Sequence, residues 1–239
     1  MGRAYQNRKE SMAKTSDMKA KVYSRYGREI YVSAKSGGVE PSNNLSLRSL
    51  IDRAKKDQVP THVIDKAIEK AKGGTGEDFF SARYEGYGPG GSIAIIECLT
   101  DNPNRTFGDV RLAFTKTDCK IGTQGSVAHQ FDHVAIFVFD FDNEETAFDG
   151  LMAEDIDITD IEYDDGKVSV FVLHTDYFKA KQALLNSCGE VDFEVDEVQF
   201  ISHDYVSLED DDTVLFDKFM TMLNELDDVQ QVYHNVKLL

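Results

Sequence analysis

Four cations in the first predicted helix are spaced so that their side chains share one face. Lys21, Arg25, Arg28 and Lys35 follow one another at steps of four, three and seven residues, and such steps return to the same side of an α-helix. Long cationic side chains on one surface neutralise phosphates and release counterions on contact. The spacing therefore indicates phosphate contact, and the plain alternative is a solvated face that carries charge for solubility.

Further cations precede this helix, in a basic tail over residues 1–14, and follow it on two more predicted helices. The candidate nucleic-acid-binding residues are Lys9, Lys14, Lys21, Arg25, Arg28, Lys35, Asn44, Arg48, Arg53, Lys55, Lys56, Lys66, Lys70 and Lys72. Arg83 and Arg105 are secondary candidates.

The charge of the chain is divided unevenly between its two ends. The 239 residues carry a net charge of -17. Residues 1–72 hold 16 Lys and Arg against 8 Asp and Glu, a net of +8, and residues 73–239 hold 10 against 35, a net of -25. Such asymmetry indicates a basic module attached to an acidic body.

Apolar spacing predicts three short helices that would position the cations. The first begins near Thr15 and ends at the Gly37-Gly38 pair. The second is capped by Ser42 or Asn43, and the third is capped by Thr61, directly after Pro60. In each helix apolar residues recur at three- and four-residue steps, which predicts a small helical module with an internal core.

The remaining chain predicts an α+β fold. Strand patterns flank a Gly88–Gly91 turn, Asp101 or Asn102 caps a following helix, and residues 127–131 are predicted as a strand. The stretch 134–202 has the order β-α-β-β-α-β, which is the ferredoxin-like pattern. A helix capped by Ser207 and a strand over residues 229–236 complete the chain.

No motif in the sequence favours catalysis or a bound cofactor. Residues 86–91 satisfy GxGxxG, but a strand follows where a dinucleotide site needs a helix. His129 and His133 are four apart on predicted strands, where that spacing does not form a metal site. The acidic runs over residues 140–144 and 209–212 fit helix starts better than cation sites. We therefore expect no enzyme, no cofactor, no metal and no small-molecule substrate.

The hydropathy of the chain indicates a soluble protein. Its longest apolar runs are well short of the roughly 18 residues that a membrane-spanning helix needs, and no secretory signal follows Met1. The three cysteines are far apart and form no CxxC motif. These features predict a cytoplasmic location and no membrane partner.

Several blocks of the sequence together resemble the YebC/PmpR family of probable transcriptional regulatory proteins, and most closely its YeeN-like subgroup. The blocks lie in the family's order and span nearly the whole chain. They are YGREIYVSAKSGGVEPSNNL at residues 26–45, RYEGYGPGG at 83–91, TDNPNRT at 100–106, GTQGSV at 122–127 and VYHNV at 232–236. At the N-terminus the family's GHSKW-like stretch is replaced by Gly2-Arg3-Ala4-Tyr5-Gln6, which contains no Trp.

The resemblance implies a three-domain YebC-like architecture. Residues 1–78 would form the basic tail, helical module and linker, residues 79–133 with 204–239 a central α/β domain, and residues 134–203 an inserted ferredoxin-like domain. It also implies one of two functions. The first is a DNA-binding transcriptional regulator. The alternative, from relatives that include mitochondrial translational activators, is a translation factor that binds the ribosome and its RNA and relieves stalling at proline-rich stretches.

Overall fold

The computed structural model describes residues 19–74 and 78–237. They form two compact units: residues 128–205 make one, and the described residues before 128 with residues 206–236 make the other. Candidates Lys9 and Lys14, and residues 75–77 of the predicted linker, lie outside the described residues. The predicted three-domain boundaries stay a prediction. No helix of the described chain has the length and apolar character needed to cross a membrane.

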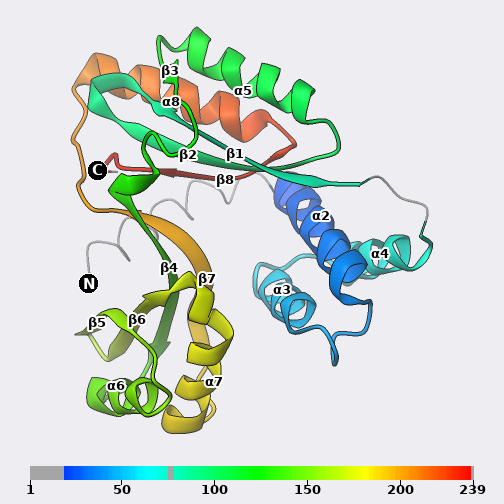
Figure 1. Ribbon diagram of the computed structural model, residues 1–239, viewed down its shortest axis with the longest axis vertical. Coiled ribbons are helices and arrows are strands. Elements are labelled where there is room, and N and C mark those ends of the chain that lie inside the picture. The colour runs from blue at the N-terminus through cyan, green and yellow to red at the C-terminus, as the bar shows by residue number, and fades with distance from the viewer. Residues whose placement is uncertain (1–18, 75–77, 238–239) are drawn as a thin grey trace. The chain divides into compact units, whose positions relative to one another are not determined.

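The three predicted N-terminal helices are confirmed. They are α2 (Lys19–Gly37), α3 (Leu45–Lys56) and α4 (Thr61–Lys72), and α2 packs against both of the others (Figure 1). Ile30, Leu47 and Ile64 contribute one apolar residue from each helix to a shared core, and each is at most 3% exposed. The apolar spacing that predicted the helices therefore also places these residues in the core of the module.

A four-stranded antiparallel sheet forms the centre of the same unit. Its order is β3 (Lys120–Ile121), β1 (Phe80–Tyr87), β2 (Ile93–Thr100) and β8 (Val229–His234). Helices α5 (Pro103–Lys116) and α8 (Asp210–Glu225) lie side by side over the sheet (Figure 1). Between them Phe114 and Phe219 are buried, with ring centres 4.8 Å apart in an edge-to-face contact. The last helix and strand thus return to this sheet, as the resemblance implied.

The unit of residues 128–205 has the ferredoxin-like order that the sequence predicted. Its sheet runs β5-β6-β4-β7, and helices α6 and α7 cover one face (Figure 1). The elements are β4 (Phe131–Asp140), α6 (Glu144–Ala153), β5 (Ile158–Asp164), β6 (Lys167–Leu173), α7 (Tyr177–Cys188) and β7 (Phe193–Ser202). Phe137, Phe139 and Leu151 are fully buried between the sheet and these helices. The α+β fold class is confirmed.

The prediction of a strand over residues 127–131 is wrong. Residues Ala128–Gln130 form a short 3-10 helix, and β4 begins only at Phe131. The reason is a buried carboxylate: Glu85, 2% exposed, accepts from the backbone N–H of Gly125 at 2.7 Å and of Val127 at 2.8 Å. Because these contacts fix the backbone before Ala128, local strand propensity is overridden.

Candidate nucleic-acid interface

The cations of α2 contact the end of α8 and the turn that follows it. Arg28 Nη1 lies 2.9 Å from Asp228 Oδ1 and donates to the Asp227 carbonyl oxygen at 2.6 Å. Arg25 Nη2 donates to Asn224 Oδ1 at 3.3 Å. The C-terminal end of a helix attracts cations, since its last carbonyls have no partner in the helix and its dipole is negative there. Arg25 and Arg28 are therefore half-buried.

Asp228 is the centre of a polar cluster that joins α2, β2 and α5. Its side chain is only 8% exposed. One oxygen pairs with Arg28, and the other accepts hydrogen bonds from Arg105 Nη2 at 2.7 Å, Thr106 Oγ1 at 2.7 Å and Thr100 Oγ1 at 3.1 Å. Burial by itself raises the pKa of Asp228, but the hydrogen bonds from these three donors outweigh burial and hold the pKa below its ordinary value.

The pKa of Asp228 predicts how stability changes in acid. Because folding lowers this pKa, the stabilisation is complete above the unfolded value of about 3.9 and is lost as pH falls through the folded value. We expect the free energy of unfolding of the wild type to fall more steeply below about pH 4 than that of an Asp228→Asn variant. Urea unfolding at a series of pH values measures both slopes, and parallel curves would contradict the prediction.

The face formed by Lys21, Arg25 and Arg28 therefore differs from expectation in its surroundings. The sequence placed it in solvent, opposite the apolar seam of the helical module. In the structure it lies against the end of α8, and burial lowers the pKa of both Lys21 and Arg25. The Asp228 carboxylate neutralises the charge of Arg28, so less of the charge of this face is left to meet phosphates.

Lys35 and Arg53 are held by neighbours within their own unit. Lys35 Nζ donates to Asp78 Oδ1 at 2.7 Å and lies 5.5 Å from the centre of the Tyr31 ring. Arg53 Nη2 lies 4.0 Å from Glu29 Oε2. The Lys35–Asp78 contact also joins the far end of the glycine-rich linker to α2.

Asn44, a candidate for nucleic-acid contact, caps α3. Its side chain is buried, and its Oδ1 accepts from the backbone N–H of Leu47 at 3.0 Å. Its Nδ2 donates to the carbonyl oxygens of Ser33 at 2.9 Å and Gly38 at 2.8 Å. Both amide hydrogens and the oxygen are thus used inside the helical module, which satisfies a buried polar group.

An Asn44→Ala variant should be less stable than the wild type by about 1–2 kcal/mol, because it removes an N-cap and the two hydrogen bonds that the Asn44 amide donates to backbone carbonyls. The sequence predicted Ser42 or Asn43 as this cap, which is wrong: the cap is Asn44, and Asn43 is exposed. Asn43→Ala is therefore the matched control, with an expected change within about 0.5 kcal/mol. Urea unfolding of both variants measures the difference, and equal losses would contradict the capping role.

Six candidate cations are exposed on α3 and α4, and they are called the α3–α4 cations below. They are Arg48, Lys55, Lys56, Lys66, Lys70 and Lys72. The apolar faces of the two helices point into the module core, so these side chains point outward. The two secondary candidates are paired: Arg83 lies 2.8 Å from Glu97, and Arg105 lies 2.7 Å from both Asp101 and Asp228.

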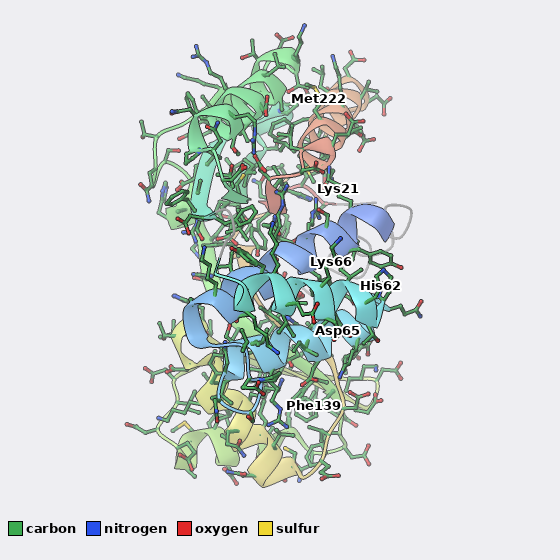
Figure 2. All side chains as sticks on the ribbon, turned by 90° about the vertical axis from the view of Figure 1, so that its right-hand side faces the viewer. Lys21, His62, Asp65, Lys66, Phe139 and Met222 are labelled. Carbon is green, nitrogen blue, oxygen red and sulfur yellow. The ribbon has the colours of Figure 1, made fainter. Side chains whose placement is uncertain are left out.

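A groove of about 800 Å³ beside α4 was missed by the sequence reasoning. It is called the α4–α5 groove below. Its lining includes His62, Lys66 and Lys70 of α4, Tyr23 of α2, Phe79, Arg105 and Asp109 of α5, Glu225 at the end of α8, and Asp227. Figure 2 shows His62 and Lys66 on the same side of α4. The four-residue spacing of the three α4 side chains was visible in the sequence. No local pattern in the sequence indicated that residues of α5 and α8 line the same groove.

The other motifs have structural explanations in this fold. The GxGxxG stretch forms the β1–β2 hairpin, as predicted, and Pro89–Gly91 form a 3-10 turn within it. His133 stacks between His174 and Phe200, with ring centres 3.8 Å and 4.1 Å away. The acidic run at residues 209–212 forms the N-cap and first turn of α8, where carboxylates are favoured by the helix dipole.

These features define a class of protein: a basic three-helix module joined to an α/β domain that carries a ferredoxin-like insertion. Comparison with known families identifies it. Residues 3–74 match the family described as "TACO1/YebC protein N-terminal domain", and residues 79–236 match "TACO1/YebC second and third domain". The chain belongs to the TACO1/YebC family.

Relatives match over the full length of the chain. A protein from Alcanivorax borkumensis is 72% identical over 100% of both chains, and one from a Marinomonas species is 66% identical over 99% of this chain and 100% of its own. Both are named probable transcriptional regulatory proteins. The crystal structure of a conserved hypothetical protein from Aquifex aeolicus is similar with a TM-score of 0.73 and 30% identity, covering 91% of this chain and 90% of that one.

Proposed function

We propose that this chain is a non-enzymatic, cytoplasmic regulator of gene expression that binds nucleic acid through the α3–α4 cations. The observation that carries the proposal is the exposure of all six α3–α4 cations to solvent, whereas Arg25 and Arg28 are half-buried against the end of α8. Most of the acidic charge lies elsewhere, since residues 73–239 carry a net of -25. A gathered cationic surface on an acidic protein suits a polyanionic partner.

DNA is the first candidate target. The relatives' names describe probable transcriptional regulators. In addition, α3 and α4 are joined by only four residues, 57–60, and helices joined by three or four residues occur in helix-turn-helix motifs. Lys66 and Lys70 are exposed on the second of these helices, which is the helix that enters the major groove in such motifs.

Ribosomal RNA is the second candidate target. In this case the chain would be a translation factor that binds ribosomes stalled at proline-rich stretches and relieves the stalling. The observation that favours it is the acidic lining beside α4. Asp109, Glu225 and Asp227 line the same groove as Lys66 and Lys70, and they would repel the second backbone of a duplex. Irregular and single-stranded RNA presents its phosphates without that second backbone.

Two measurements distinguish these targets. A transcriptional regulator should bind some promoter with an affinity roughly a thousandfold or more above that for random DNA at the same salt concentration. A translation factor should co-sediment with ribosomes, and a deletion strain should show ribosome pauses inside coding sequences. Absence of polynucleotide binding and of co-sedimentation would overturn the proposed function.

A further inference from the structure

One wall of the α4–α5 groove is cationic. His62, Lys66 and Lys70 lie four residues apart along α4, so their side chains form a stripe on one side of the helix. All three are exposed. Lys70 Nζ lies 5.4 Å from the centre of the Tyr31 ring, a cation–π contact that holds this ammonium near the groove. The stripe suits a chain of phosphates that runs along α4.

The opposite wall carries carboxylates. Asp109 comes from α5, Glu225 is the last residue of α8, and Asp227 follows it. All three side chains are exposed. A carboxylate accepts hydrogen bonds and repels phosphate. This wall therefore cannot hold a second phosphate backbone, but it can accept from N–H groups of a ligand.

Aromatic rings also line the groove. Tyr23 and Phe79 line the groove and are only partly buried. The Arg28 guanidinium lies 5.6 Å from the centre of the Phe79 ring, and Asp228 holds that guanidinium in place. Exposed rings and guanidinium planes of this kind are the surfaces on which unpaired nucleobases stack.

We propose that the α4–α5 groove binds a short single-stranded segment of polynucleotide. The phosphates lie along Lys66 and Lys70, bases stack at Tyr23 and Phe79, and Asp109 and Glu225 accept hydrogen bonds from the exocyclic amino groups of bases. Carboxylates are the side chains that accept from the N4 amino group of cytosine. Uracil offers a carbonyl oxygen at that position, which a carboxylate repels, so cytosine is favoured over uracil. This inference rests on the proposed function and names the ligand of one part of its surface.

A single strand fits the groove better than a duplex for two reasons. The groove volume of about 800 Å³ lies within the range of small-molecule sites, which accommodates a few nucleotides rather than a helix. In a duplex the base edges are paired and the second backbone would meet the acidic wall. Only an unpaired segment can place bases between the walls while its phosphates stay on α4.

The test uses the full-length chain with fluorescent oligonucleotides of cytidine, uridine and deoxycytidine, together with a duplex of the same length. We expect oligocytidine to bind about tenfold more tightly than oligouridine. An Asp109→Asn/Glu225→Gln variant should lose this preference without weakening oligouridine binding. A Lys66→Glu/Lys70→Glu variant should weaken both single strands by about tenfold or more. Equal binding of cytidine and deoxycytidine oligomers would show that the groove reads the base and not the 2′-hydroxyl.

A Lys116→Glu/Lys120→Glu variant is the matched control, because it reverses two exposed lysines that do not line the groove. The inference is overturned if the wild type shows no preference for cytidine, or if neither groove variant changes binding. If an Arg48→Glu/Lys55→Glu/Lys56→Glu variant loses affinity while the groove variants do not, the groove inference fails and the proposed function stands. If the wild type binds no polynucleotide, both fail.

Discussion

Reversing Arg48, Lys55, Lys56 and Lys72 to glutamate is expected to lower polynucleotide affinity by about 100-fold at 50 mM salt. Each cation that meets a phosphate contributes about 0.9 to the slope of log affinity against log salt on duplex DNA. If these four residues each make one contact, the slope should fall by about three to four. The four side chains are exposed and lie outside the α4–α5 groove. The change therefore tests the proposed function independently of the groove.

The matched control reverses Arg111, Lys116, Lys120 and Lys179 in the same chain. It changes one arginine and three lysines that are also exposed, so the net charge changes equally. If affinity depends on net charge alone, both variants should lose the same amount. Fluorescence anisotropy across a salt series, with circular dichroism to show that both variants are folded, measures the difference. An equal loss, or no loss in the first variant, would contradict the α3–α4 cations as the interface.

The fold was largely predictable because its signals are local. In α3 the apolar residues that recur at three- and four-residue steps are Leu47, Leu50, Ile51 and Ala54, and all four are buried. The βαββαβ order followed from alternation and turn residues in the same way. The prediction of a strand over residues 127–131 failed because of a distant residue. Glu85, about forty residues earlier, accepts hydrogen bonds from the backbone N–H groups of Gly125 and Val127.

The candidate site was less predictable because it depends on contacts between distant parts of the chain. The spacing of Lys21, Arg25 and Arg28 did place them on one side of α2. Periodicity could not show what covers that side, since Arg28 and Asp228 are 200 residues apart. The same holds for the α4–α5 groove. The cationic stripe on α4 is visible in the sequence, but only the tertiary structure brings Asp109 and Glu225 to the same groove.

An Asp228→Ala variant is expected to lose about 3 kcal/mol of unfolding free energy. The change removes the acceptor of Arg28, Arg105, Thr100 and Thr106 at once. Removing one partner of a buried ion pair typically costs 3–5 kcal/mol, because the other charge is left without compensation. Solvent reaches Arg105, which is 46% exposed, so the lower end of that range applies.

Asp227→Ala is the control that makes this prediction specific. Asp227 is adjacent and exposed, and Arg28 contacts its carbonyl oxygen rather than its side chain. Its replacement should therefore change the unfolding free energy by no more than about 0.5 kcal/mol. Urea unfolding compares the two variants, and hydrogen exchange of α2 amides shows where the loss occurs. If Asp228 joins α2 to the central sheet, exchange in α2 should accelerate in Asp228→Ala alone. A loss shared equally by both variants would mean that the negative charge near α2 matters, and not the buried cluster around Asp228.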